Sequence, residues 1–417
     1  MHKLVINIQT LAGITNHDKA LRGAELAILN TISHAWIAIK DGCIEDFGEM
    51  KELDINLYES YEIIDAKAAT VLPCWCDSHT HLVFAATRED EFVDKLKGKT
   101  YAEIAANGGG ILNSAKKVQA ATEEELYAAT WERLKQLIVR GTGAIEIKSG
   151  YGLTPDAEIK MLRVIKAIKQ NAPIPIKASF LGAHTYPSVY KENHAGYINE
   201  IIEKMLPTIE KEKLADYIDV FCEEGFFSAK ETTAICEAGK RKGLLPKLHV
   251  NQLNSIGGIE AGIAAGAISM DHLETLNEQE INLLANWKGI STLLPTAAFF
   301  LRMAYQPARN LIDAGAAVAL ASDYNPGSSP SGNMNFVTAL SCIQMKMLPE
   351  EVINAATING ACAMQVEKET GSIAKGKKAN FIFTHPHTSI AYLFYAFGNN
   401  HIDKVMINGN WFNSSFN

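Results

Sequence analysis

The 417-residue sequence lacks several features that would mark particular classes of protein. No segment approaches the roughly 20 apolar residues of a membrane-spanning helix. The net charge is −8, so the chain has no overall basic character with which to bind nucleic-acid phosphates. The first residues, MHKLVINIQTLAG, lack the basic start, apolar run and cleavage site of a secretory signal. We therefore expect a cytoplasmic protein with neither a membrane nor a nucleic acid as its partner.

Cysteine usage also argues against a secreted, disulfide-bonded protein. The seven cysteines are an odd number and lie scattered along the chain, which does not fit a disulfide framework. Cys74 and Cys76 resemble half of a thiolate metal site, but no second pair follows them. Buried strand thiols are the favoured interpretation. Hydrophobic residues make up 47% of the chain, which is enough for a large core without disulfides.

The two ends of the chain are predicted to be rich in β-strands. Asp41-Gly42 lies between short apolar runs near the start, and Asn408-Gly409 does so near the end. Both pairs are typical of tight hairpin turns. We expect residues 1–70 and 366–417 to pair into a small discontinuous β-sandwich domain, with residues 71–365 forming a separate domain between them.

In this central segment, short buried strands alternate with amphipathic helices such as PDAEIKMLRVIKAIKQN. Each predicted strand is a continuous apolar run, as expected for strands covered on both faces. The alternation predicts a parallel sheet of the α/β class, and at this length a (β/α)8 TIM-like barrel is the leading form. The predicted strands are VLPCWCDSHTH, GAIEIKSG, IKASFLGAH, YIDVFCEEG, PKLHVNQ, AISMDHLE, GISTLLPT and AVALASDYNPG.

Each of these strands ends in a polar side chain, several of them suited to chemistry. Active sites of such barrels collect at the carboxyl ends of the strands, so this pattern predicts a catalytic site there. The strand-end residues are His81, Lys148, His184, Glu223, His249, His272, Thr296 and Asp323.

A subset of these residues has the composition of a metal site. His79 and His81 lie on one face of a strand, because strand side chains repeat every two residues. Together with His249 and Asp323 they suit one ion of zinc or iron. Two alternatives remain at this point: Asp323 could be a helix N-cap, and Lys148 could be carbamylated to bridge two ions. The place of Lys148 on the second strand favours a single ion.

Several motifs make the sequence similar to the imidazolonepropionases, a family of the amidohydrolase superfamily. They are DSHTHLVFAATREDEF, IEIKSGYGL, FLGAH, KLHVNQ, DHLE and SDYNPGSSP, and the resemblance runs across the whole predicted barrel. It implies a small-molecule substrate and allows a homodimer. The implied reaction is hydrolysis of 4-imidazolone-5-propanoate to N-formimidoyl-L-glutamate in histidine degradation, by attack of a metal-bound hydroxide on the ring carbonyl.

The resemblance also implies which residues bind the substrate. Arg88 would supply a planar, bidentate cation for the propanoate. His184 would lie beside the ring carbonyl and stabilise the developing oxyanion together with the metal. Without the resemblance, a surface ion pair for Arg88 and a simple turn at Asn325 would be the better interpretations. The implied substrate-binding residues are Arg88, Tyr151, His184, Asn325, Gly327 and Ser328.

The implied catalytic residues are Asp323, His272, His184 and Gln252. His272 is the candidate for orienting the attacking water or relaying a proton, with a structural histidine as the alternative. Gln252 occupies a position where some family members carry glutamate, and an amide cannot shuttle a proton. The leaving nitrogen would then be protonated by His272, Asp323 or water. Rival functions are another cyclic amidohydrolase, a purine or pyrimidine aminohydrolase, and a non-catalytic scaffold with the same fold.

Overall fold

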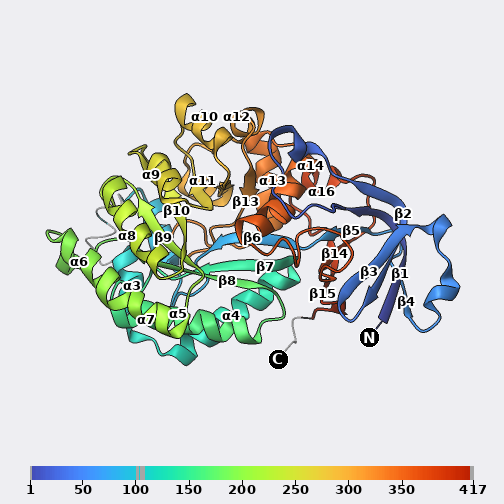
Figure 1. The fold of residues 1–417 in the computed structure, drawn as a ribbon, viewed down its shortest axis with the longest axis horizontal. Coiled ribbons are helices and arrows are strands. Elements are labelled where there is room, and N and C mark those ends of the chain that lie inside the picture. Colours follow the sequence, from blue (N-terminus) through green and yellow to red (C-terminus); the bar gives the residue numbers. More distant parts are fainter. Residues whose placement is uncertain (1, 100–102, 104–108, 414–417) are drawn as a thin grey trace.

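A computed structural model describes residues 2–99, 103 and 109–413, and its strands form two separate sheets of eight strands each (Figure 1). In one of them the strands follow one another in chain order and run parallel. The predicted barrel of alternating strands and helices is thereby confirmed. Its strands are β6 (Trp75–Thr80), β7 (Thr142–Lys148), β8 (Ile176–Ala183), β9 (Tyr217–Cys222), β10 (Leu245–Val250), β11 (Ser269–His272), β12 (Ile290–Leu293) and β13 (Val318–Leu320).

The barrel closes between its first and last strands through a small number of hydrogen bonds. The backbone N–H of Asp323 donates to the carbonyl of His79 at 3.0 Å. The buried carboxylate of Asp77 accepts from the backbone N–H and the hydroxyl of Ser322, at 2.9 and 2.6 Å. Closure therefore places the end of β6 directly beside the segment that follows β13.

Helices connect consecutive barrel strands and begin at residues suited to that role. Thr122 forms a capping box with Glu125 at the start of α4, and Thr154 caps α5, which has Pro155 in its first turn. The α-helices are α1 (Glu89–Leu96), α3 (Ile111–Ala120), α4 (Glu123–Val139), α5 (Pro155–Asn171), α6 (His194–Glu200), α7 (Leu206–Glu212), α8 (Ala229–Arg241), α9 (Gly258–Ala265), α10 (Glu278–Asn286), α11 (Pro295–Leu301), α12 (Ala308–Asp313), α13 (Met334–Met345), α14 (Pro349–Asn354), α15 (Gly360–Ala363) and α16 (Tyr392–Tyr395).

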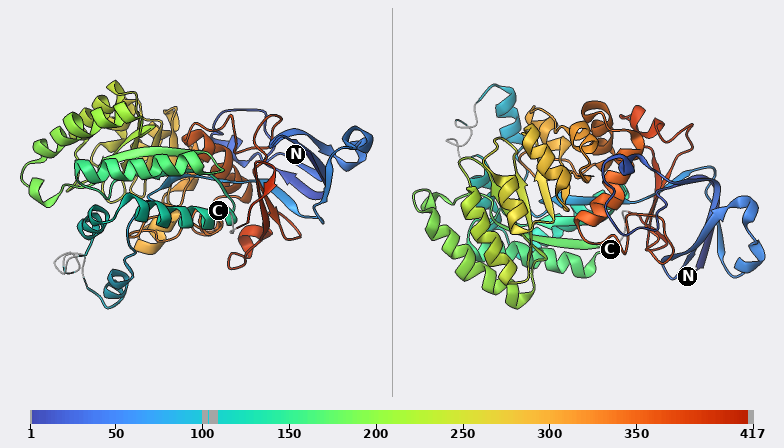
Figure 2. Two further views of the ribbon diagram at one scale, coloured as in Figure 1. Left: turned by 90° about the horizontal axis from the view of Figure 1, so that it is seen from below. Right: turned by 45° about the horizontal axis from the view of Figure 1, so that its top comes forward.

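The two ends of the chain meet in the second sheet, beside the barrel (Figure 2). Strand β14 lies between β15 and β5, so the predicted pairing of the termini is confirmed. Both predicted hairpin turns form, with positive φ angles at Asp41-Gly42 and Asn408-Gly409. The strands are β1 (His2–Ala12), β2 (Thr31–Lys40), β3 (Cys43–Glu49), β4 (Glu62–Asp65), β5 (Thr70–Pro73), β14 (Phe381–Thr384), β15 (Ile402–Ile407) and β16 (Asn410–Trp411).

The predicted first barrel strand is divided between the two sheets. Its beginning, β5, pairs with β1 and β14 in the terminal sheet, whereas β6 pairs with β7 in the barrel. Cys74 lies between them and is fully buried. We therefore propose Cys74 as the boundary at which the chain passes into the barrel.

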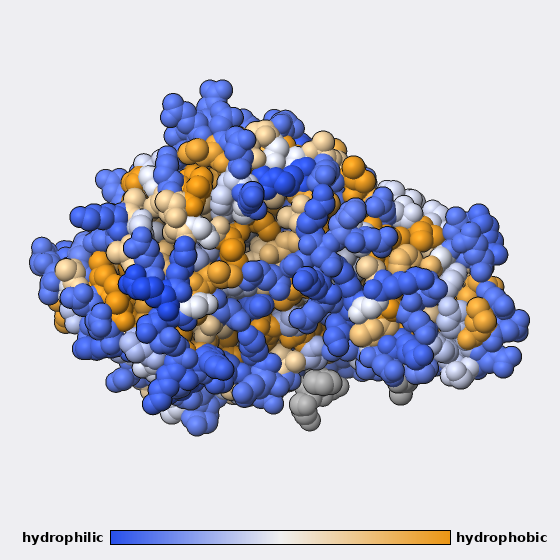
Figure 3. All heavy atoms as spheres, in the orientation of Figure 1, coloured by the Kyte–Doolittle hydropathy of each residue, from blue (hydrophilic) through white to orange (hydrophobic). Residues whose placement is uncertain are grey.

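Each sheet has its own hydrophobic core. One cluster of buried residues fills the space around the barrel strands, and a second, centred on residues such as Val5 and Phe381, belongs to the terminal sheet. On the face drawn in Figure 3, polar residues predominate and hydrophobic ones form separate patches. Among the described residues, no helix combines the length and the apolar character needed to cross a membrane.

Candidate metal centre and substrate pocket

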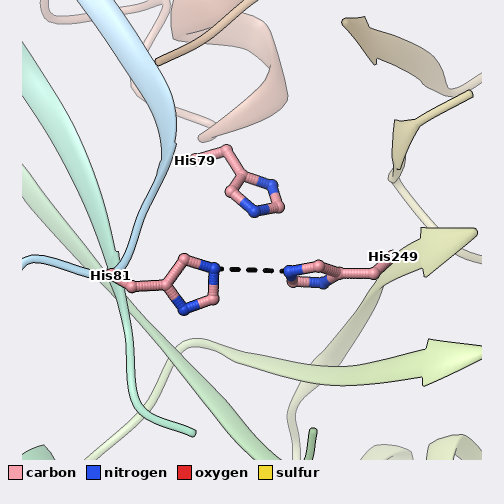
Figure 4. A group of neighbouring side chains, drawn as sticks. All are labelled: His79, His81 and His249. Atoms are coloured by element: carbon pink, nitrogen blue, oxygen red, sulfur yellow. Dashed lines mark hydrogen bonds between the residues drawn. The ribbon is translucent and has the colours of Figure 1, made fainter. Parts of the chain in front are cut away.

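Four predicted ligands meet at the carboxyl end of the barrel. His79 belongs to β6, His81 follows it, His249 belongs to β10, and Asp323 follows β13. The Oδ1 atom of Asp323 lies 3.5 Å from Nε2 of both His79 and His81. The Nε2 atoms of His81 and His249 lie 3.4 Å apart, and Figure 4 shows the three imidazoles turned toward one another. All four residues are at most 3% exposed.

The spacing of these atoms fits a single bound ion. Ligand atoms about 2.1 Å from one tetrahedral ion lie roughly 3.4 Å from each other, close to the separations described above. In addition, Nε2 of His79 is buried and has no hydrogen-bond partner among the described residues. A buried polar atom without a partner calls for an ion or a water. Three imidazoles and one carboxylate are a donor set that suits zinc and iron.

Two carboxylates beneath the site fix the orientation of two of the imidazoles. Asp271 Oδ2 lies 2.6 Å from Nδ1 of His79, and Asp219 Oδ1 lies 3.0 Å from Nδ1 of His249. Because a carboxylate only accepts hydrogen bonds, Nδ1 carries the proton in each ring. The Nε2 lone pairs therefore face the centre of the site, as metal binding requires.

Burial controls the charges of the four candidate ligands. It lowers the pKa values of His79, His81 and His249 well below the usual range, and nearby cations and imidazoles add to this effect. Burial raises the pKa of Asp323 to about 6, against the opposing effect of His272. At neutral pH the site therefore holds three neutral imidazoles and one carboxylate.

His272, at the end of β11, lies next to the four candidate ligands but has a different charge preference. Its ring centroid lies 5.3 Å from that of His249, and its Nδ1 lies 3.3 Å from Oε1 of Glu274. Burial acts to lower the pKa of His272, but the charge and hydrogen bond of Glu274, together with Asp323, raise it overall. His272 is therefore the imidazole of this site that is best suited to carry a proton.

The backbone at these strand ends is strained. Asp323, His272 and Leu273 have φ angles of 51°, 86° and 65°, in a region that residues with side chains rarely adopt. Each such residue costs about 1–3 kcal/mol, and residues of this kind cluster at functional sites. The strained residues thus lie at the same strand ends as the candidate catalytic residues His272 and Asp323.

A cavity of about 380 Å³ adjoins the candidate metal centre. A smaller inner space, lined by His81, His249, His272 and Asp323, shares six lining residues with it. The cavity therefore leads to the donor atoms. Its walls include every predicted substrate-binding residue and Gln252, namely Arg88, Tyr151, His184, Gln252, Asn325, Gly327 and Ser328.

Arg88 is held in this cavity by a contact that the sequence did not indicate. Its Nε atom donates to Oγ of Ser114, in α3, at 2.8 Å. Its Nη2 atom is buried without a hydrogen-bond partner among the described residues, and its Cζ atom lies 5.8 Å from the centroid of the Tyr151 ring. A bound carboxylate would satisfy the unpaired guanidinium nitrogen.

The segment that contains Asn325 holds Asp323 in place through hydrogen bonds. Oδ1 of Asn325 accepts from the backbone N–H groups of Gly327 and Ser328, at 2.7 and 2.8 Å, and Nδ2 donates to the carbonyl of Asp323 at 2.7 Å. A Cβ atom on Gly327 would lie 2.6 Å from Nη1 of Arg88. These backbone N–H groups are already used, which differs from the expected contact of open backbone with substrate. The segment instead holds Asp323 and leaves room for Arg88.

His184 has a tautomer that differs from the one its expected role requires. Its Nδ1 atom lies 3.0 Å from the carbonyl oxygen of Gly150, which can only accept. Burial lowers the pKa of His184 to about 4, so at neutral pH the ring is neutral and Nε2 carries a lone pair. A lone pair cannot stabilise an oxyanion, but it can accept a hydrogen bond from a ring N–H.

The loop that carries Gln252 is fixed by a buried carboxylate. Oε2 of Glu223 accepts from the backbone N–H groups of Leu253 and Asn254, at 2.8 and 3.2 Å. Its Oε1 accepts from the side-chain amide of Asn254 at 3.1 Å. Gln252 is thus held at the wall that both spaces share, where its amide can contact a ligand.

Sequence reasoning did not identify Asp219, Asp271 or Ser114 as part of the site. The two acids had a usable signal, because a carboxylate inside an otherwise apolar barrel strand must find a partner. Ser114 had none, since its contact with Arg88 arises only when α3 packs against the segment after β6.

The barrel and its histidine–aspartate donor set define the amidohydrolase class, and the sequence model of the amidohydrolase family matches residues 70–412. Solved structures share the fold. E. coli guanine deaminase gives a TM-score of 0.73 at 14% identity, with 99% of this chain and 98% of that chain covered. The 5-methylcytosine deaminase from Klebsiella pneumoniae gives 0.72 at 16% identity, with 98% and 97% covered.

Sequence similarity identifies one family within the amidohydrolase class. The imidazolonepropionase of Flavobacterium johnsoniae is 55% identical over 410 residues, which cover 98% of this chain and 99% of the relative. The imidazolonepropionase of Brevibacillus brevis is 41% identical over 406 residues, which cover 96% and 95%. The chain is an enzyme of the imidazolonepropionase family within the amidohydrolases, as its motifs predicted.

Proposed function

We propose that the protein hydrolyses 4-imidazolone-5-propanoate to N-formimidoyl-L-glutamate in histidine degradation. The observation that carries this proposal is one connected cavity that is lined by Arg88 and leads to His81, His249 and Asp323. His79 completes the donor set beside them. The substrate has a cyclic amide carbonyl open to attack by water and a flexible carboxylate tail. The donor set suits the carbonyl group, and the guanidinium of Arg88, whose Nη2 atom is buried, suits the carboxylate tail.

The four donor residues would hold one zinc or iron ion. When bound, such an ion polarises a carbonyl group and makes water acidic enough to react near neutral pH. Asp323 accepts the proton of the attacking water, because its carboxylate lies among the donor atoms beside which that water would react. The hydroxyl of Ser328 donates to Oδ2 of Asp323 at 3.2 Å and orients this carboxylate.

The remaining residues position the ring and supply the second proton. His272, whose pKa is raised, delivers a proton to the leaving ring nitrogen. Nε2 of His184 accepts a hydrogen bond from a ring N–H, in place of the oxyanion contact that the resemblance implied. The amide of Gln252 contacts the ring without transferring a proton, and Arg88 binds the propanoate.

Loss of the Ser114 hydroxyl should weaken substrate binding without touching the reacting atoms. Ser114→Ala removes the acceptor of Arg88 Nε, and a hydrogen bond to a charged group contributes about 1.5–3 kcal/mol. We expect KM to rise about tenfold or more, with kcat changed little. Steady-state kinetics would check this. Ser331→Ala, on a half-buried serine outside the cavity lining, is the control.

Metal binding should depend on pH through one proton. Burial holds the pKa values of the three imidazoles well below their usual range, whereas the pKa of Asp323 is raised to about 6. Below pH 6 a proton therefore competes with the ion for Asp323 alone, and the affinity for zinc should fall about tenfold per pH unit. Competition titrations with a chelator between pH 5 and 7 would measure this slope. A slope of three or four protons would contradict the assigned charges.

Labelled water would test both the proposed reaction and its position of attack. In H₂¹⁸O, attack on the ring carbonyl places the new oxygen in the α-carboxylate of N-formimidoyl-L-glutamate. Attack on the amidine carbon would place it in a formyl group. Mass spectrometry of the product distinguishes the two, with guanine as a control ring that lacks a carboxylate tail. No product from the metal-loaded protein would refute the substrate.

A further inference from the structure

Directly beneath the donor set, the barrel interior holds five charged side chains that are all 0% exposed. Such a cluster is costly unless every charge is paired. Barrel interiors of this fold are usually filled by branched apolar residues, so this composition requires an explanation. We call these residues the buried charge cluster: Glu146, Lys148, Asp219, Lys247 and Asp271.

The two lysines of the cluster share Glu146 but differ in their other partners. Nζ of Lys148 lies 2.6 Å from Glu146, 2.8 Å from Oδ2 of Asp219 and 3.6 Å from Oδ2 of Asp271. Lys247 also pairs with Glu146, but its other hydrogen bonds among the described residues go to backbone carbonyls, and its Nζ lies 5.4 Å from the centroid of the Tyr217 ring. Lys148 is thus the lysine that contacts both carboxylates behind the candidate ligands.

These contacts connect Lys148 to two imidazoles at once. Asp219 accepts from Nδ1 of His249 through Oδ1 while it binds Lys148 through Oδ2. Asp271 uses Oδ2 for Nδ1 of His79 and for Lys148. One ammonium group therefore holds both of the acceptors that orient His79 and His249.

We propose that Lys148 is a positioning residue of the metal centre, which fixes His79 and His249 through Asp271 and Asp219. The proposal rests on the metal site described under Proposed function. It also replaces the alternative of a carbamylated Lys148, because carbamylation needs a free amine and this nitrogen is fully engaged with carboxylates.

A positioning role for Lys148 and a purely electrostatic role predict opposite effects of its loss on metal affinity. A buried cation close to the site repels a bound metal ion, so by charge alone the loss of Lys148 would tighten binding. If Lys148 positions the ligands, its loss releases two mutually repelling carboxylates and weakens binding. Outer partners of metal ligands typically change affinity by about 10–100-fold, and we expect a weakening of this size.

The test compares Lys148→Met with Lys247→Met in the full-length protein. Both variants remove a fully buried ammonium that contacts Glu146. We expect Lys148→Met to bind cobalt(II) and zinc about 10–100-fold more weakly and to change the visible spectrum of bound cobalt. Lys247→Met should lose thermal stability to a similar extent but keep the cobalt spectrum. Unchanged or tighter binding in Lys148→Met, with the original spectrum, would overturn the proposal.

Two further comparisons keep the test decisive. If the methionine variants do not fold, Lys148→Arg should still alter the cobalt spectrum while Lys247→Arg should not, and identical spectra would count against the role of Lys148. If the unaltered protein binds neither metal, the metal centre itself fails. If the unaltered protein binds metal and substitution of Lys148 changes neither the affinity nor the cobalt spectrum, only the positioning role is refuted.

Discussion

Replacing Asp323 with asparagine should lower kcat by about 10²- to 10⁴-fold, the range found for loss of a general acid or base. Asparagine has nearly the same shape, and its amide can keep the contact with Ser328. It cannot accept the proton of the attacking water, and it is a poorer ligand for a cation than a carboxylate. Turnover of the zinc-saturated variant at substrate saturation is the measurement.

The matched control is Asp313→Asn, on an exposed aspartate of α12 that pairs with Arg309. A surface pair of this kind contributes little to stability, so this variant should keep full activity. If Asp323→Asn retained more than about a tenth of the activity, its proposed role in proton transfer would be wrong.

Replacing Arg88 with methionine should raise KM far more than it lowers kcat. Removal of one partner of a buried, hydrogen-bonded charge pair costs about 2–5 kcal/mol, which corresponds to roughly 30- to several-thousand-fold in kcat/KM. The propanoate binds Arg88 in both the ground state and the transition state, so the loss falls mainly on KM. Steady-state kinetics with the full substrate would show this.

Two controls separate this effect from a general disturbance. Arg140→Met alters an exposed arginine at the end of α4 and should leave KM unchanged. An imidazolone that lacks the propanoate should react equally slowly with the unaltered protein and with Arg88→Met. If the variant had a normal KM for the full substrate, Arg88 would not be the carboxylate anchor.

The barrel could be predicted because its sequence signals are local and repeated. Each strand is a continuous apolar run between amphipathic helices, and parallel strands bring their carboxyl ends to one edge whatever the details of packing. The hairpins at Asp41-Gly42 and Asn408-Gly409 were equally local. The division between β5 and β6 was not visible, because both strands are buried and Cys74 between them is buried as well.

The clustering of the four candidate ligands was also predictable from the sequence, whereas the residues that support them were not. His79, His81, His249 and Asp323 lie at strand ends, where the fold itself indicates chemistry. The partner of Arg88, the tautomer of His184 and the internal hydrogen bonds of Asn325 depend on contacts between distant segments. Because of these contacts we propose that His184 accepts a hydrogen bond and that residues 325–328 support Asp323, in place of the direct stabilisation of substrate that the resemblance implied.

We propose that one ion, held by His79, His81, His249 and Asp323, enables hydrolysis of 4-imidazolone-5-propanoate. The most direct measurement removes metal from the protein, returns zinc or iron in steps, and follows substrate loss by its absorbance at each step. We predict negligible turnover without metal and a linear rise that ends at one ion per chain. Full turnover by the metal-free protein, or a rise that continues to two ions per chain, would contradict the claim.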